Sequence, residues 1–265
     1  MMLSQGPGFH VPPVTELFTW KPILTFELGG IEFKVTVLTI IMFAATAVLG
    51  TLFLAAFSNP RVVPSGLQNV MEGGVGFVRE NIVLPVLGPH GERWMPFLTA
   101  MFFWVFALNF LGVVPAINFP VTSRMALPVF LSALVYIIFN TVGVKTHGPL
   151  RYLKANLFPP GVPKPIYLIL TPIEFFSTFI VRPLTLAVRL FANMMAGHVI
   201  LTIFFLASAY FLYRGDSLFL KILTPFPFAL AVILIGFEIF VGAIQAFIIT
   251  ILTAVYIAGA SETEH

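Results

Sequence analysis

Three charged residues, an asparagine and a histidine stand within the strongly apolar stretch of residues 171–202. They are Glu174, Arg182, Arg189, Asn193 and His198. An ionisable group at the centre of a bilayer costs from about 3 to more than 10 kcal/mol, so such groups are rare and usually face a cavity or a partner. An arginine cannot shed its charge to avoid that cost. The stretch therefore predicts a permanent cation inside a membrane, with a counter-charge supplied by this chain or by another.

The spacing of these residues separates two kinds of chemistry. At about 100° per residue, four side chains fall on a narrow stripe along one side of a helix: Arg182, Thr185, Arg189 and Asn193. His198 lies roughly 180° away from Arg189, so the opposite side of the predicted helix carries a group that titrates near neutral pH. The alternative is that the two arginines extend to the lipid headgroups. Long apolar runs on both sides of Arg189 weaken that alternative there.

The composition places these residues in a membrane protein. The chain has 265 residues, of which 58% are hydrophobic and 9% charged, and its mean hydropathy is +0.99. A soluble domain has about 25% charged residues. The chain has no cysteine, which excludes thiolate chemistry, and its net charge of +3 is too small and dispersed to indicate nucleic acid. We find no phosphate-binding glycine loop, nucleophile elbow or metal-ligand spacing, and therefore expect no cofactor and no bound metal.

The sequence predicts an all-α, polytopic membrane protein with a tail, residues 1–34, and a single membrane domain, residues 35–265. A short hairpin is predicted in the tail around Gly29-Gly30, where apolar and polar residues alternate on both sides. Three uncharged apolar runs are long enough to cross a bilayer, namely residues 35–57, 96–115 and 125–144. Residues 64–87 carry apolar side chains along one helical face, which indicates a helix lying in the membrane interface.

Two C-terminal segments are longer than a simple membrane span requires. Residues 165–213 would form a helix about 70 Å long, whereas the hydrocarbon core is only about 30 Å thick. No Gly, Asn or Asp turn cluster interrupts them, so we predict a strongly inclined helix with a kink at Pro172 or Pro183. Residues 221–259 are predicted to form a second inclined helix, after a turn at residues 214–217.

The distribution of basic residues predicts the orientation in the membrane. If residues 64–87 do not span, seven cations share one side, and the side rich in Lys and Arg is the cytoplasm. These cations are Arg61, Arg79, Arg93, Lys145, Arg151, Lys154 and Lys164. The N-terminus is therefore expected outside the cytoplasm and the C-terminus inside it.

An antiparallel packing of the two long helices predicts which residues meet. A turn near Ser217 places Arg189 opposite Gln245, and His198 within a residue or two of the position facing Glu238. A histidine and a glutamate together in a low-dielectric interior can form a proton relay, or a neutral hydrogen-bonded pair that only joins the helices. Glu174, further along its helix, is either a second proton acceptor or a carboxylate in interfacial water.

Two segments carry a specific resemblance. PLTLAVRLFANMMAGH at residues 183–198 and FEIFVGAIQAFIITILTAVYI at residues 237–257 closely resemble subunit a of bacterial rotary F-type ATP synthases. The combination of an arginine signature with an Ile-Gln-Ala-Phe signature at this spacing is specific. The resemblance covers roughly residues 96–264, and the N-terminal third matches only in layout.

The resemblance implies a role for each candidate residue. Arg189 would be the essential stator arginine that faces the ring of c subunits. Its polar neighbours would be Thr185, Asn193 and Gln245. The proton-uptake half-channel would contain His198, Glu238, Asn109 and Asn118. The proton-release half-channel would contain Glu174 and Ser177. The chain would be a non-catalytic, proton-translocating subunit in the bacterial plasma membrane. Its partners would be the c-ring, the peripheral stalk subunit b and the rest of the ATP synthase.

Some features depart from the family pattern or leave alternatives open. Some family members carry a carboxylate at the His198 position and a histidine at the Glu238 position, so this chain has the swapped arrangement. The resemblance leaves open whether the transported ion is H⁺ or Na⁺. The alternative function is a stand-alone secondary transporter in which Arg189 binds an anionic solute, but the sequence shows no convincing inverted repeat. A purely structural membrane scaffold would not need several buried ionisable groups.

Overall fold

The computed structural model describes residues 22–28, 30–114, 121–158, 163–213 and 218–261. The predicted hairpin is confirmed: strands β1 (Leu24–Leu28) and β2 (Ile31–Val35) pair antiparallel, with Leu28 opposite Ile31. Gly30 occupies the turn with φ of 82°, a left-handed conformation that glycine adopts without steric cost. The tail before residue 22 lies outside the described residues.

Helices dominate the rest of the described chain, and five helical segments among its described residues are long and apolar enough to cross a membrane. Three of them correspond to the shorter predicted spans: α2 (Val37–Phe57), α5 (Met95–Leu111) and α6 (Ala126–His147). The predicted all-α, polytopic membrane fold is therefore confirmed. The predicted end of the second span was too late, because α5 ends at Leu111, and α6 extends three residues beyond its predicted end.

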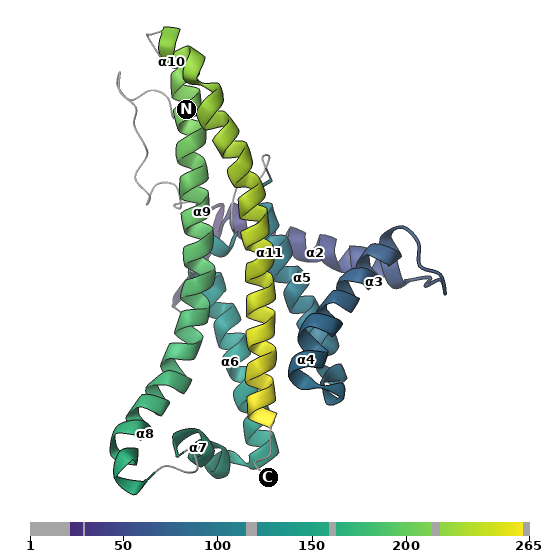
Figure 1. Cartoon of the computed structure of the whole chain (residues 1–265), viewed down its shortest axis with the longest axis vertical. Helices are drawn as coiled ribbons and strands as arrows, with labels where there is room; N and C mark the ends of the chain where they lie inside the picture. The colour runs from purple at the N-terminus through teal and green to yellow at the C-terminus, as the bar shows by residue number, and fades with distance from the viewer. Residues whose placement is uncertain (1–21, 29, 115–120, 159–162, 214–217, 262–265) are drawn as a thin grey trace.

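The first long C-terminal segment is helical from Tyr167 to Tyr213 and does not fold back, as predicted. It consists of α8 (Tyr167–Phe176), a π-helical turn η5 (Ser177–Val181) and α9 (Arg182–Tyr213). Pro183 has no N–H to give to the carbonyl four residues earlier, and Arg182 instead donates its N–H to the Ser177 carbonyl. The irregular turn thus lies between the two prolines at which a kink was predicted, and Figure 1 shows α8 leaving the line of α9.

The second long segment was predicted as one helix and is two. Helix α10 (Leu218–Leu223) is separated from α11 (Pro225–Ser261) at Thr224, directly before a proline at the first position of the longer helix. The predicted turn at residues 214–217 lies outside the described residues. In Figure 1, α9 and α11 run side by side over most of their length.

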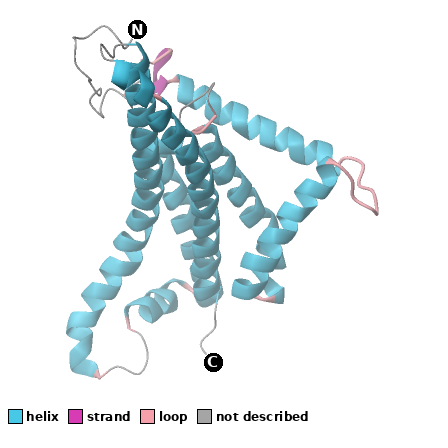
Figure 2. Ribbon diagram, turned by 45° about the horizontal axis from the view of Figure 1, so that its top comes forward, coloured by secondary structure: helices cyan, strands magenta, loops and turns pink. Residues whose placement is uncertain are grey.

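The predicted interfacial segment is a broken helix. It contains α3 (Leu67–Val78), the π-helical turn η1 (Arg79–Val83) and α4 (Leu84–Leu87). The 3₁₀ segment η2 (Pro89–Trp94) follows the predicted end of this segment. Helices α2 and α3 form an arm that projects from the bundle (Figures 1 and 2). The placement of residues 64–87 in the membrane interface stays a prediction.

The sequence did not predict the helix α7 (Pro149–Leu157), which lies in the segment between the third span and the long helices. Gly148, with φ of 79°, ends α6, and Pro149 then begins α7. Two 3₁₀ segments complete the described elements: η3 (Val121–Ser123) and η4 (Lys164–Ile166).

Helix α11 is the centre of the bundle, because it packs against α5, α6 and α9. Its buried face is built from small residues, including Ala246, Thr250, Thr253 and Ala254, each of which is fully buried. Small side chains let helices approach closely in a membrane, where close packing replaces the hydrophobic effect. This close approach fixes the distance and register between α9 and α11, the two helices that carry the candidate site.

Candidate functional site

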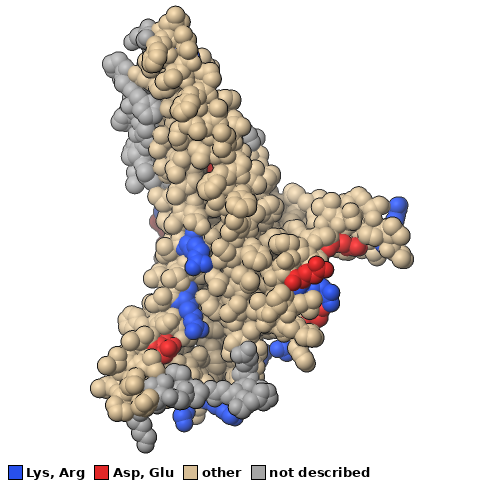
Figure 3. All heavy atoms as spheres, in the orientation of Figure 1, with Lys and Arg blue, Asp and Glu red and all other residues tan. Residues whose placement is uncertain are grey.

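Arg189 lies on the outer face of α9. Its neighbours Leu186, Ala187 and Leu190 are buried in the bundle, whereas Arg189 itself is exposed. Within the described part of the chain its guanidinium makes no hydrogen bond, ion pair or cation–π contact. Figure 3 shows Lys and Arg atoms in two separate patches along this side of the molecule, above a small patch of Asp and Glu atoms. The counter-charge that a membrane cation needs therefore does not come from the described residues.

Arg182 differs from Arg189, although both lie on the predicted stripe. The guanidinium carbon of Arg182 lies 5.7 Å from the centre of the Tyr256 ring on α11, a cation–π geometry. Between the two arginines, Thr185 donates its hydroxyl hydrogen bond to backbone carbonyls of its own helix at Val181 and Arg182. Of the two arginines, only Arg189 has no partner among the described residues and can therefore pair with a group of another chain.

Gln245 is paired one helical turn away from its predicted partner. Its Oε1 accepts a hydrogen bond of 2.9 Å from Nδ2 of Asn193, whereas the sequence placed it opposite Arg189. The reason is the direction of the side chains: Arg189 points outward, and Gln245 is 1% exposed inside the α9–α11 interface. Nε2 of Gln245 is buried and has no partner among the described residues. Asn193 therefore links the exposed helix stripe that carries Arg189 to the buried amide of Gln245.

His198 and Glu238 are both buried between the long helices, at 5% and 6% exposure. Glu238 packs onto α9 at Gly197, the residue next to His198, where an added Cβ would lie 3.0 Å from Oε1 of the carboxyl group. A larger side chain at this position would have to displace the carboxyl group by a few tenths of an ångström. Oε1 of Glu238 is buried without a hydrogen-bond partner among the described residues. An unsatisfied buried polar atom costs about 1–3 kcal/mol, so this position fits water or a transferred proton.

A cavity of about 260 Å³ lies beside Glu238, between α9 and α11. Asn193, Gly197 and Glu238 supply its lining together with apolar residues of both helices. Two of its lining side chains, Asn193 and Glu238, are polar, and it is large enough for several water molecules. The buried carboxyl group and the amide that reaches the Arg189 stripe therefore line one cavity, which can hold a short chain of water.

Asn109 is fully engaged in packing. Its Nδ2 donates a 3.2 Å hydrogen bond to the Gly242 carbonyl on α11, and its Oδ1 accepts a 3.0 Å hydrogen bond from the Thr122 hydroxyl. Thr122, which is fully buried, was not singled out in the sequence, although it is a polar residue in the short segment between the second and third predicted spans. The other predicted asparagine, Asn118, lies outside the described residues.

Glu174 is separated from the other acid of the site. It is half-buried on α8, and its backbone carbonyl accepts the N–H of Ser177, which is also half-buried. Along the helix Glu174 lies about 22 Å from Arg189, at 1.5 Å per residue. Glu238 faces Gly197, on the other side of Arg189 along the same axis. Along the axis of α8 and α9, Arg189 therefore lies between the two acids, with Glu174 on one side and Glu238 of α11 on the other.

Comparison with known proteins shows to which family the chain belongs. The sequence profile described as ATP synthase A chain matches residues 37–258. The chain is 39% identical over 250 residues to ATP synthase subunit a of Rhodococcus erythropolis, covering 94% of this chain and 89% of that one. It is 41% identical over 264 residues to ATP synthase subunit a of a Parafrankia species, covering 98% and 87%. The similarity to ATP synthase subunit a of a Nocardioides species is 38% over 270 residues, covering 99% and 96%.

Proposed function

The chain belongs to the ATP synthase A chain family, and from this premise we propose that Arg189 separates two proton half-channels that lead to a rotating carboxylate. As a member, it is a multi-pass membrane component of the proton-translocating part of an ATP synthase. The single observation that carries the proposal is the position of Arg189 without an acidic partner. It is exposed on a long apolar helix and makes no contact with an acid of the described residues.

The counter-charge comes, in this proposal, from a carboxyl group on a c subunit that moves past α9. Opposite charges within about 4–6 Å favour the ionised form of a carboxyl group, so Arg189 makes the incoming carboxylic acid release its proton. When the two groups separate, the carboxylate must be protonated again before it can enter lipid. Because Arg189 stays charged and repels protons, it also prevents a direct leak between the two half-channels.

The uptake half-channel is proposed at the Glu238 side of Arg189. The cavity beside Glu238 and Asn193 supports this assignment, because a titratable group and space for water occur together there. His198, buried one residue from the Glu238 contact at Gly197, is the second proton carrier in this proposal. Asn109 and Gln245 hold the helices that form the path, since both donate or accept hydrogen bonds across helix interfaces.

The release half-channel is proposed at the opposite end, around Glu174 and Ser177. Both side chains are half-buried on the part of the helix that bends away from the bundle. With the basic loops in the cytoplasm, this end lies on the cytoplasmic side, the N-terminus outside and the C-terminus inside. Protons driven inward gain about 2.3 kcal/mol per charge for each 100 mV of membrane potential. In this arrangement subunit b and the other stator subunits hold the chain against rotation.

A cross-linking experiment tests the partner of the Arg189 face. The sequence has no cysteine, so Ala192→Cys introduces a unique thiol on the exposed face next to Arg189. A photoreactive maleimide on that thiol, in the assembled complex, is expected to capture a small two-helix subunit with a membrane carboxylate. The matched control Ala47→Cys, exposed on α2, is expected not to capture that subunit. A stand-alone transporter would give no subunit adduct at Ala192→Cys, and that outcome would overturn the proposal.

A further inference from the structure

A second charged site lies away from the Arg189 face, between η2 and the C-terminal half of α6. It is a groove of about 420 Å³ with two cations, Arg93 and Lys145, at its rim. Three apolar side chains of α6, Ile137, Ile138 and Val142, form what we call its floor. Thr141 and Thr146 also line the groove, and their hydroxyl groups donate hydrogen bonds to backbone carbonyls of α6. A groove that combines cations with an apolar floor is complementary to a molecule with an anionic end and a hydrocarbon end.

The two cations of this groove are not neutralised by the described residues. Arg93 and Lys145 are both exposed, and neither forms an ion pair with a described carboxylate. The nearest acid in sequence, Glu92, is already held by Arg79, with an Nη2–Oε1 distance of 2.6 Å and a 2.8 Å hydrogen bond from Nε. This hydrogen bond and the charge of Glu92 raise the pKa of Arg79 above its ordinary value. The rim of the groove therefore keeps its positive charge.

Trp94 adds a hydrogen-bond donor to the same groove. Its indole Nε1 is buried and has no hydrogen-bond partner among the described residues. The guanidinium carbon of Arg93 lies 5.8 Å from the centre of the Trp94 ring. Tryptophan is typical of membrane–water interfaces, where its ring lies in apolar surroundings and its N–H meets a polar group. The indole fits an acceptor oxygen at headgroup depth.

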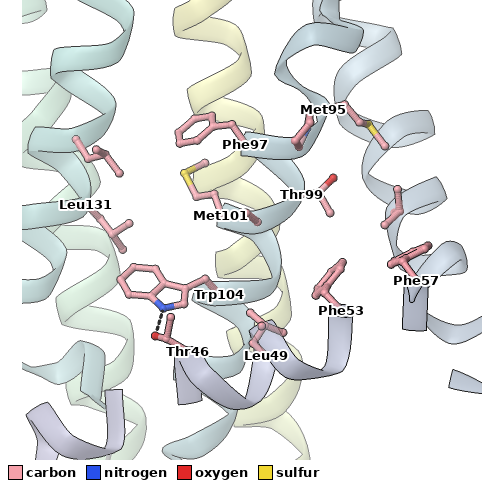
Figure 4. Close-up of a pocket in the computed structure, with 15 residues that line it drawn as sticks. Thr46, Leu49, Phe53, Phe57, Met95, Phe97, Thr99, Met101, Trp104 and Leu131 are labelled. Atoms are coloured by element: carbon pink, nitrogen blue, oxygen red, sulfur yellow. Dashed lines mark hydrogen bonds between the residues drawn. The ribbon is translucent and has the colours of Figure 1, made fainter. Parts of the chain in front are cut away.

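Helical spacing extends the apolar side of α6 beyond the groove by about the thickness of one leaflet. Lys145, Ile138 and Leu134 are spaced by about one or two helical turns on one face, and Leu134 lies about 16 Å from Lys145. Half of a hydrocarbon core is about 15 Å. Leu134 also lines an apolar cavity of about 760 Å³ between α2, α5 and α6. Figure 4 shows this cavity, in which the Trp104 indole already donates a 2.8 Å hydrogen bond to Thr46.

We propose that this groove is a binding site for an anionic phospholipid. The phosphate lies between Arg93 and Lys145 and accepts a hydrogen bond from the Trp94 indole, and an acyl chain follows Ile137 and Ile138 along α6. Basic pockets between membrane helices are suited to anionic headgroups. Free phosphate would use only the rim, and an acidic peptide would leave the apolar side of α6 uncovered. The site is independent of the proton path, because none of its residues is among those proposed to carry protons or to separate the two half-channels.

The test uses the full chain in its assembled complex, reconstituted into phosphatidylcholine vesicles that contain phosphatidylglycerol with a photoreactive acyl chain. After illumination, mass spectrometry is expected to find labelled peptides around Trp94 and around Ile137 and Ile138. The double variant R93Q/K145Q is expected to lower this labelling by about tenfold. The matched control R151Q/K154Q removes one exposed Arg and one exposed Lys from the neighbouring α7 and is expected to label like the wild type.

A milder variant keeps the test valid if the double variant fails to assemble. Trp94→Phe keeps the aromatic ring and removes only the N–H, and it is expected to lower labelling several-fold. Equal labelling by a photoreactive phosphatidylcholine, or wild-type labelling of R93Q/K145Q, would overturn the proposal. Displacement of the lipid probe by millimolar inorganic phosphate would indicate a phosphate site instead. Labelling of a neighbouring subunit in place of the groove would show that a polypeptide covers it, and would also overturn the proposal.

Discussion

Two arginines on one helix face illustrate how the chemistry of a residue depends on its partner. Arg182 is placed over the Tyr256 ring, which stabilises a cation within the chain. Arg189, two positions further along the stripe, has no such contact among the described residues. The residue types and their spacing are enough to predict the stripe. They do not distinguish the two arginines, because Tyr256 lies on another helix and the contact depends on how the helices pack.

The carboxyl group of Glu238 is the most informative single titratable residue. It is 6% exposed, lines a cavity and has a buried oxygen without a partner in the described chain. We expect Glu238→Gln, which keeps the size of the side chain but cannot release a proton, to lower proton-driven ATP synthesis by about tenfold or more, since a positioned proton-transfer group contributes roughly 10²–10⁴-fold. The measurement is ATP synthesis by reconstituted vesicles under an imposed proton gradient.

The control for this variant is Glu80→Gln, which removes an exposed carboxyl group at the π-helical turn η1. It is expected to leave synthesis unchanged. Near wild-type synthesis by Glu238→Gln, with the subunit present in the complex at normal amounts, would remove Glu238 from the proposed path.

At the scale of elements, the site depends on how closely α9 approaches α11. Gly197 faces the Glu238 carboxyl group, and Gly242 faces Asn109, with an added Cβ 3.0 Å and 3.1 Å from its neighbour, respectively. Glycine at such positions lets a polar side chain of one helix lie against the backbone of another. The close contact at Gly197 therefore holds Glu238 in the position at which it lines the cavity.

We expect Gly197→Ala to lower proton-driven ATP synthesis by about tenfold, because small displacements of a proton-transferring group are costly. The added methyl group would push the flexible end of Glu238 away while leaving the helix intact, so the unfolding temperature in detergent should change little. The matched control is Gly236→Ala, on α11, where an added Cβ meets nothing within 4 Å. That variant should keep full activity and gain up to about 1 kcal/mol of helix stability. Equal activity of the two variants would contradict the assignment.

The sequence predicts the elements better than their register. Long uncharged runs predict the spans of α2, α5 and α6 within a few residues, because length and hydropathy alone decide whether a helix can cross a bilayer. The partner of Gln245 was misplaced by one helical turn, because packing of the Gln245 side chain into the interface decides the pairing. Helix α7 was missed because its sequence is rich in basic residues and begins with a proline after a glycine, a pattern that also suits a loop.

The irregular helices were only partly predictable. A proline inside a helix predicts a break in the hydrogen-bond ladder, and the π-helical turn Ser177–Val181 does lie directly before Pro183. The pattern does not say whether the chain kinks, adds a residue to the turn or ends the helix. At Pro225 the helix ends and restarts, whereas at Pro183 it continues through a wider turn. Packing against neighbouring helices decides between these outcomes, as in the contact of Ser132 on α6 with the Pro183 carbonyl.

At the scale of the whole molecule, the proposed path requires that its two ends do not meet. Glu174 and Glu238 lie on either side of Arg189 along the axis of α8 and α9. A continuous water path past Arg189 would dissipate the gradient, because protons would cross without moving a partner. The permanent charge of one guanidinium between the two acids is what closes this path in our account.

Proton-driven ATP synthesis by Arg189→Lys vesicles tests this account most directly. A lysine keeps a positive charge but can give up its proton inside a membrane, so we predict loss of synthesis and a faster passive decay of the proton gradient. Arg182→Lys, the same substitution on the same helix, keeps its cation near the Tyr256 ring and is predicted to synthesise ATP at a nearly normal rate. Near-normal synthesis and an unchanged gradient in Arg189→Lys vesicles would contradict the central claim.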